Sequence, residues 1–196
     1  MRFLQNILKI MRMRKEKINS FVLVVDLEAC CWMGNPPEGQ YKEIIEIGIA
    51  CVDYFTKEII SSRSIIVKPE FYEIGKFCTE LTTLTPEYVK ENGVSFKEAC
   101  KILLNEYQSD KRMWISWGDY DRVAFEKECV LKKVEYPFGR THFNLKEWYA
   151  FKYGLKQSPG VSTALKKIGI EFEGVQHRGV DDAKMTAMIL KNICGL

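Results

Sequence analysis

The stretch that decides the fold is residues 21–32, FVLVVDLEACCW. Its apolar, β-branched first half is typical of a buried β-strand. Side chains two residues apart on a strand point to the same face, so Asp26 and Glu28 would lie side by side, about 6–7 Å apart. Two buried carboxylates repel each other and are costly to leave unpaired. We therefore expect either a cation between them or a strand end that is open to water.

The size and composition of the chain suit one globular domain. It has 196 residues, of which 46% are hydrophobic, and a net charge of +3. That charge is compatible with a polyanionic ligand but is weak evidence for one. The seven cysteines include no C-x-x-C pair, and no convincing secretory leader is present, which predicts reduced thiols in a cytoplasmic protein. The adjacent Cys30 and Cys31 are too close in sequence for a usual zinc site.

Residues 1–20 mix apolar and basic side chains at helical spacing. The apolar part is far shorter than the ~20 residues of a membrane span, and Lys9 interrupts it. We expect a basic, disordered leader followed by a single domain over residues 21–196, with no membrane partner. The alternative is a basic amphipathic helix that attaches to a membrane, an RNA or a ribosome surface.

The order of the expected elements indicates a mixed α/β sheet. Strands come first, as a meander, and then alternate with helices. This order predicts a sheet with antiparallel and parallel parts, flanked by helices. The strands are expected over residues 21–27, 42–53, 59–67 and 112–117, and the helices from residue 86 and over 96–107, 120–131, 145–153, 162–168 and 180–194.

Two further acidic segments lie at predicted strand ends or helix starts, 117–121 (WGDYD) and 177–182 (HRGVDD). Such ends can converge on one crevice in an α/β fold. On a helical wheel, Asp182 falls on the apolar, inward face of the last helix, whereas Asp181 falls on the wet side. Asp182 is therefore the aspartate that needs a partner.

The same argument separates Asp121 from Asp119. Asp121 shares a helix face with Ala124, Phe125 and Glu128, and we assign it to the site. Asp119 precedes the helix, where an aspartate commonly caps it.

The order D-x-E, then Tyr-Asp, then His-x-x-x-x-Asp resembles the DEDDh family of 3′→5′ exonucleases, the superfamily of RNase T and polymerase proofreading domains. The finer pattern is similar to its enhanced-RNAi and KapD-type branch. The resemblance runs from about Phe21 to Cys194 through VVDLEACCW, EIIEIGIACVD, WGDYD, HFNLKEWYAFKYGL and HRGVDDAKMTAMIL. It implies an RNase H-like fold.

The chain departs from the family pattern at two places. FCTELTTLTPE resembles the family's E-L-T-G-I-T, but Thr83 replaces the usual glycine. Cys30-Cys31-Trp32 stands where proofreading enzymes commonly have Thr-Thr-Gly, which favours the RNA-processing branch.

The resemblance implies a role for each of five residues, all present in this chain. Asp26, Glu28, Asp121 and Asp182 would hold two Mg²⁺ or Mn²⁺ ions, hard cations that prefer oxygen ligands. Asp26 would reach both ions, and Asp121 would act mainly through water. His177 would be the general base on the attacking water, a task that suits a side chain titrating near neutral pH.

Substrate handling is expected to involve the loop after the metal-binding strand. Leu27, Cys30, Trp32 and Met33 are predicted to contact the terminal base or sugar. A phosphate track is a further hypothesis, for Lys132, Lys133, Lys152, Lys156, Lys166 and Lys167. By contrast, we interpret His142 and Trp117 as structural.

The leading hypothesis is a two-metal 3′→5′ exonuclease that trims single-stranded RNA and releases nucleoside monophosphates. One alternative keeps the enzyme class but prefers DNA or short oligonucleotides. Another is a nuclease-like regulatory binding protein, of the sporulation-inhibitor type. The intact set of five residues favours an enzyme, because a binding relic has little reason to keep a costly cluster of acids. The oligomeric state stays open.

Overall fold

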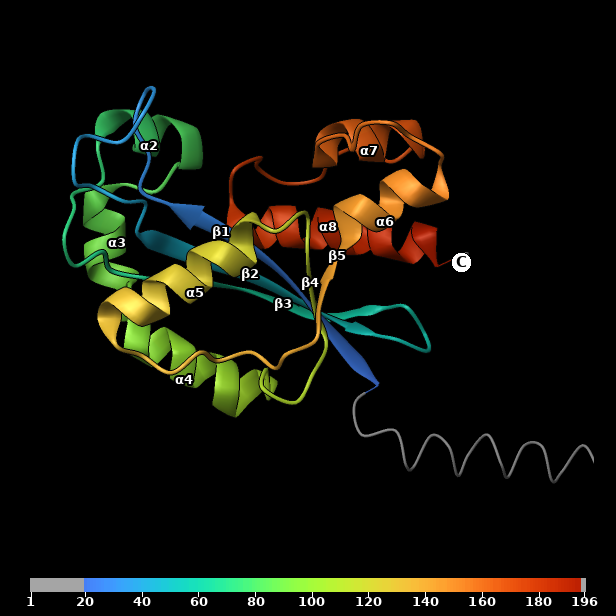
Figure 1. Ribbon diagram of the computed structural model, residues 1–196, viewed down its shortest axis with the longest axis horizontal. Helices are drawn as coiled ribbons and strands as arrows, with labels where there is room; N and C mark the ends of the chain where they lie inside the picture. The colour runs from blue at the N-terminus through green and yellow to red at the C-terminus, as the bar shows by residue number, and fades with distance from the viewer. Residues whose placement is uncertain (1–19, 195–196) are drawn as a thin grey trace, which may run out of the picture.

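A computed structural model describes residues 20–194, which fold around a five-stranded mixed sheet (Figure 1). The strand order is β3-β2-β1-β4-β5. The first three strands form the antiparallel meander, while β4 and β5 extend the sheet in parallel with β1. The predicted fold class is therefore confirmed. The strands are β1 (Phe21–Ala29), β2 (Ile44–Asp53), β3 (Ile59–Ile66), β4 (Trp114–Ser116) and β5 (His142–Asn144).

Helices cover both faces of the sheet (Figure 1). The first core layer packs α4 and α5 against one face, and the second packs α6, α7 and α8 against the other. A third, smaller cluster joins α2 and α3 to the chain beyond the end of β1. The helices are α2 (Lys76–Thr82), α3 (Pro86–Asn92), α4 (Phe96–Tyr107), α5 (Tyr120–Lys132), α6 (Leu145–Lys152), α7 (Val161–Lys167) and α8 (Gly179–Ile193).

The central strand β1 is buried on both faces. Leu23, Val25 and Leu27 point into the first core layer, whereas Val22 and Val24 point into the second. Burying each such side chain contributes about 1.5–3 kcal/mol. Asp26 and Glu28 continue the Val22–Val24 face by the two-residue period, so the strand carries them toward α8, which packs there.

Side-chain caps begin the helices where the sequence predicts them. The Ser95 hydroxyl accepts from the Glu98 N–H at 3.2 Å, and the Thr85 hydroxyl accepts from the Tyr88 N–H at 3.1 Å. Asn144 Oδ1 accepts from the Glu147 N–H at 3.2 Å. Each such cap stabilises its helix by about 1 kcal/mol.

The cap prediction for Asp119 is wrong. This residue occupies the position before α5 with helical φ and ψ of −99° and −7°, and its side chain makes no cap hydrogen bond. Its carboxylate instead accepts from Asn144 Nδ2 at 3.0 Å and pairs with Arg122. Short elements also escaped prediction: α2 follows Gly75, an N-cap residue with no capping side chain, and β5 has three residues.

Two glycines bring α8 against the sheet. A Cβ on Gly48 of β2 would lie 1.8 Å from the carbonyl carbon of Gly179, and a Cβ on Gly179 would lie 3.0 Å from the Asp26 carbonyl oxygen. The first turn of α8 therefore touches β1 and β2 backbone to backbone. This close approach helps to place Asp182, three residues after Gly179, beside the β1 acids.

The chain ends bear on two other predictions. Residues 1–19 lie outside the described part of the chain, and with them nearly all of the predicted leader. Within residues 20–194, none of the helices has both the length and the hydropathy that crossing a membrane requires.

Gly48→Ala is expected to destabilise the protein by at least about 2 kcal/mol, because a Cβ there must push α8 off the sheet. Urea denaturation followed by circular dichroism measures the change. Gly160→Ala is the matched control, since a Cβ at Gly160 meets nothing within 4 Å. A Gly48→Ala variant as stable as the wild type would contradict the close approach.

Candidate active site

Three of the predicted acids meet at the end of β1. Asp26, Glu28 and Asp182 each offer a carboxylate oxygen, and these oxygens all lie within 4.8 Å of one another. Asp26 and Glu28 come from β1, and Asp182 comes from the first turn of α8. The spacing fits a divalent cation bound by hard oxygen ligands, such as Mg²⁺ or Mn²⁺.

Asp121 reaches the same place from the first turn of α5. It is 5% exposed, and its Oδ1 accepts from the Leu27 N–H at 3.0 Å. Leu27 stands between Asp26 and Glu28 in the sequence, so this hydrogen bond holds the Asp121 carboxylate against the strand that carries both acids. The structure therefore brings together all four predicted acids, from three elements.

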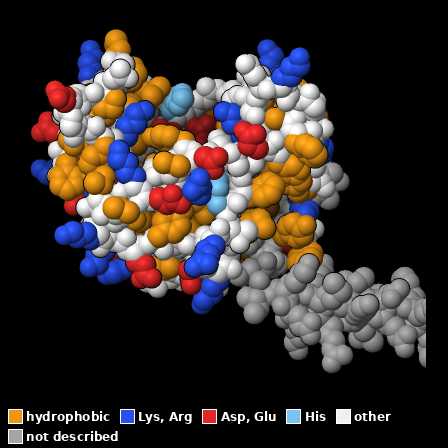
Figure 2. Space-filling view, in the orientation of Figure 1, with side chains coloured by type: hydrophobic (Ala, Val, Ile, Leu, Met, Phe, Trp, Pro, Cys, Tyr) orange, Lys and Arg blue, Asp and Glu red, His pale blue; other side chains and the backbone are white. Residues whose placement is uncertain are grey.

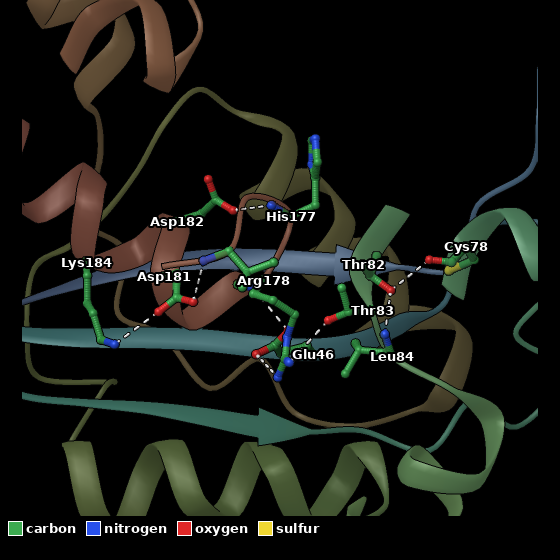
Figure 3. A network of polar contacts seen from close by, with 12 residues as sticks. Glu46, Cys78, Thr82, Thr83, Leu84, His177, Arg178, Asp181, Asp182 and Lys184 are labelled. Carbon is green, nitrogen blue, oxygen red and sulfur yellow. Dashed lines mark hydrogen bonds and ion pairs between the residues drawn. The ribbon is translucent and has the colours of Figure 1, made fainter. Parts of the chain in front are cut away.

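His177 lies on the loop before α8, with its backbone at the site and its ring outside. Its N–H donates to Asp182 Oδ2 at 2.7 Å. The residue is exposed and has a φ of 62°, in the left-handed region. In Figure 3 the imidazole points away from the Asp182 carboxylate. The backbone of His177 therefore lies next to the site, but its side chain must rotate before the imidazole faces the carboxylates.

Burial and mutual repulsion raise the pKa of every acid in the cluster. Desolvation is the largest cause each time, and neighbouring carboxylates add to it. The pKa of Asp26 lies well above its usual range, and the pKa of Glu28 rises to about 8. The pKa of Asp121 rises to about 7 and that of Asp182 to about 6. The metal-free cluster thus retains protons that a bound cation would displace.

Sequence reasoning missed a buried ion pair beside the cluster. Glu46 on β2 is fully buried and pairs in register with Glu28. It accepts from Arg178 Nε at 3.0 Å and from the Gly179 N–H at 3.1 Å. The available signal was one acid within the apolar strand IIEIGIACV, since such an acid needs a cationic partner elsewhere in the chain.

Asp181 stays outside the metal cluster, as predicted, but it does not lie in open water. Its side chain is 18% exposed, accepts from the Val175 N–H at 3.0 Å and pairs with Lys184 at 3.1 Å. Burial alone would raise the pKa of Asp181, but these two bonds and the nearby charge of Arg178 lower it. The bond to Val175 also braces the loop that carries His177. The helical wheel could not show this covering loop.

Of the four residues predicted to contact the substrate, two are buried and two are at least partly exposed. Leu27 and Cys30 are 6% and 1% exposed and belong to the packed core. Met33 is 84% exposed, and Trp32 lies half-buried with its edge toward Tyr72. Trp32 and Met33 therefore offer side-chain surface to a ligand, while Leu27 acts here through its N–H bond to Asp121.

The lysine hypothesis is wrong at Lys132. The Lys132 side chain is 3% exposed and forms ion pairs of 2.9 Å with Glu43 and with Glu128. Lys152 Nζ donates to the carbonyls of Asn192 and Ile193 at the end of α8. The remaining five lysines of that hypothesis are exposed, namely Lys133, Lys152, Lys156, Lys166 and Lys167.

The structural interpretation of His142 and Trp117 is confirmed. His142 Nε2 lies 2.8 Å from the Ser116 hydroxyl, its ring packs on Trp114, and burial lowers its pKa. The Trp117 indole donates to the Pro159 carbonyl at 3.0 Å and its ring packs on Tyr149. Neither side chain is available for catalysis.

Figure 2 shows a hollow between the region of α2 and the region of α7, with acidic side chains on its floor and basic side chains on its rim. Four carboxylates, three of them half-buried and one buried, gather at the end of the central strand of the sheet, an arrangement typical of metal-dependent nucleases.

Comparison with known proteins gives the family. Residues 23–190 match the RNase T exonuclease family, and the chain belongs to it. A solved structure, the nuclease domain of 3′hExo bound to rAMP, superposes with a TM-score of 0.83 and 26% identity, over 91% of this chain and 93% of that one. It is described as a DEDDh family member, so the predicted resemblance and the RNase H-like fold are confirmed.

Curated relatives agree with this assignment. The chain is 32% identical to ERI1 exoribonuclease 2 of Mus musculus over 200 residues, which cover 90% of this chain and 29% of that protein. It is 29% identical to 3′-5′ exoribonuclease 1 of Homo sapiens over 179 residues, which cover 86% of this chain and 51% of that protein. The chain thus spans 29–51% of the length of these two relatives.

The raised pKa values predict how the metal-free protein responds to pH. A carboxyl whose pKa is raised on folding contributes its stability fully below the unfolded value, and that stability is lost as pH rises through the folded value. For Glu28 the loss falls between about 4.5 and about 8. The melting temperature of wild type in EDTA should therefore fall from pH 5 to pH 8.5.

Glu28→Gln removes one of the repelling charges. In EDTA it should melt higher than wild type at pH 8.5, with the difference vanishing near pH 5, as differential scanning fluorimetry can measure. Asp119→Asn, outside the cluster, controls for general surface charge. A Glu28→Gln variant that melts lower than wild type at pH 8.5 would show that the acids do not repel one another in the fold.

Proposed function

We propose that this chain is a divalent-metal-dependent 3′→5′ exoribonuclease that removes nucleoside monophosphates from the 3′ ends of single-stranded RNA. The observation that carries the proposal is the meeting of Asp26, Glu28 and Asp182 oxygens within 4.8 Å, with Asp121 fixed against the same strand. Relatives named as exoribonucleases support RNA as the substrate.

The cofactor is two Mg²⁺ or Mn²⁺ ions per site. Four carboxylates carry up to four negative charges, which two dications would neutralise. Asp26, Glu28 and Asp182 would hold the inner ion, while Asp26 and, through water, Asp121 would serve the second. When bound, the ions stabilise the charge that builds on the attacking and leaving oxygens of the phosphodiester.

The residues of the chain supply orientation and proton transfer. The Leu27 N–H orients the Asp121 carboxylate, and the His177 N–H orients that of Asp182. His177 Nε2 or Nδ1 takes a proton from the attacking water as the water oxygen bonds to phosphorus and the P–O bond to the leaving 3′ oxygen breaks. The 3′ oxygen then takes up a proton from solvent. Because the ring now points away, rotation of the exposed side chain brings it over the site (Figure 3).

The terminal nucleotide would lie beside the loop that follows β1. Trp32 and Met33 give surface on which a base or sugar can pack, and the buried Cys30 belongs to the small core cluster against which Trp32 packs. Leu27 is buried in the first core layer and would act through its N–H bond to Asp121. Stacking tolerates any base and contributes about 1–3 kcal/mol per base. The exposed lysines that remain from the phosphate-track hypothesis would add affinity without sequence preference.

The state of the cysteines bears on the cellular compartment that we propose. All seven cysteines, which lie within the described residues, are free. This supports a reducing compartment, and we propose the cytoplasm. The domain organisation, a leader followed by one exonuclease domain over residues 21–196, is part of the same proposal.

Incubation with RNA labelled at either end tests the activity. Wild type with Mg²⁺ or Mn²⁺ should shorten the strand stepwise from the 3′ end, and EDTA should stop the reaction. Asp26→Asn should abolish turnover, and His177→Ala should reduce it by about 10²–10⁴-fold. Asp119→Asn, an acid outside the cluster, should retain near wild-type activity and is the control.

The same assay separates the alternatives. Faster loss of labelled DNA, or of oligonucleotides a few residues long, would favour a different substrate class. RNA binding without turnover in any metal would favour a nuclease-like regulatory protein. Activity that survives both EDTA and Asp26→Asn would contradict the mechanism.

A further inference from the structure

Arg178 is held in place by a carboxylate that the proposed mechanism does not use. Its Nε lies 3.0 Å from Glu46 Oε2 and its Nη2 lies 3.5 Å from Glu46 Oε1, so the guanidinium grips both oxygens (Figure 3). Glu46 is fully buried on β2, whereas 22% of the Arg178 side chain is exposed. The pair therefore ties the chain directly after His177 to the rigid centre of the sheet.

Backbone contacts strengthen this anchor on both sides of Arg178. The Gly179 N–H donates to Glu46 Oε2 at 3.1 Å, and Gly179 packs against Gly48 with no room for a side chain. The His177 N–H donates to Asp182 Oδ2. Residues 177–179 are thus fixed at the backbone, while the His177 ring stays exposed and able to rotate.

Arg178 also contacts the residue that follows helix α2. Its Nη1 lies 3.5 Å from the hydroxyl of Thr83, which ends α2 with a φ of 62°. This left-handed conformation is uncommon for a threonine and natural for a glycine. Thr83 stands where the DEDDh pattern has glycine, which has no hydroxyl to offer, so this contact belongs to the present chain.

We propose that Arg178 is a positioning residue that works through His177. Arg178 binds Glu46 and contacts Thr83, and in this way it holds the turn at residues 177–179 in place. From this turn the His177 imidazole rotates toward the acid cluster. A planar guanidinium can hold both carboxylate oxygens and a hydroxyl at once, whereas a lysine ammonium is a point charge. The inference rests on the proposed function, because it assigns Arg178 to the proton-transfer step.

A double-mutant cycle at saturating Mn²⁺ tests the coupling. Arg178→Lys keeps the positive charge beside Glu46 but loses the planar guanidinium that bonds both carboxylate oxygens. It should lower kcat about 10–100-fold with little change in KM. In a His177→Ala background the same change should lower kcat less than about 2-fold, because the imidazole that Arg178 positions is absent. Equal losses in both backgrounds would overturn the proposal.

Arg122→Lys is the matched control. Arg122 follows the metal-binding Asp121 on α5, and it pairs with Glu126 at 3.0 Å on the surface, without joining separate segments. It should leave kcat unchanged in both backgrounds. If Arg178→Lys does not fold, Glu46→Gln combined with Arg178→Gln leaves no lone buried charge and takes its place in the cycle.

Amide hydrogen exchange tests the anchor without any substrate. In the metal-free full chain, Arg178→Lys should speed exchange in the peptide covering residues 174–179, whereas Arg122→Lys should not. Unchanged exchange there would overturn the proposal, whatever the activity. If wild type degrades no RNA while Arg178→Lys loosens the turn, the proposed function fails and the anchor itself stands.

Discussion

The repulsion among four carboxylates at the end of β1 is the constraint on which the rest of the structure depends. Burial and proximity raise the pKa of each one, so the fold holds an arrangement that opposes its own formation at neutral pH. The apolar residues of β1 and the glycine contact between β2 and α8 supply the packing that keeps the acids together. A cation turns the same repulsion into binding energy.

Glu46 lies beside the acid cluster but is paired with an arginine, whereas the four other acids are left to bind cations. Five acids lie close together, because the pKa of Asp26 responds to Glu28, Glu46, Asp121 and Asp182. Arg178 neutralises Glu46, so the four remaining carboxylates would match the charge of the two dications that we propose. Lys132 plays a comparable part elsewhere, pairing with Glu43 and Glu128. Removing one partner of such a buried pair costs about 3–5 kcal/mol, since the other is left uncompensated.

Periodicity predicted the elements of the site that repeat regularly along one strand or helix. The two-residue period placed Asp26 and Glu28 on one face, and the helical wheel turned Asp182 toward them; the three carboxylates do meet. The wheel also put Asp121 on the face of Phe125, and both are buried. The order of strands and helices likewise predicted the mixed sheet.

What the sequence did not predict depends on contacts between distant segments. Glu46 and Arg178 are 132 residues apart, and a strand pattern cannot say which cation reaches a buried acid. Lys132 reads as a surface lysine until Glu43 and Glu128 surround it. Asp181 reads as solvated because the loop at Val175 covers it only in the folded chain. The short α2 and β5 carry too few residues to show a period.

Mn²⁺ titration of the metal-free protein, by calorimetry in two buffers of different ionisation enthalpy, measures the central claim most directly. The account predicts two Mn²⁺ bound per chain, release of protons on binding at pH 7, and loss of binding in Asp26→Asn. Binding that releases no protons, or that is the same in Asp26→Asn as in wild type, would contradict it.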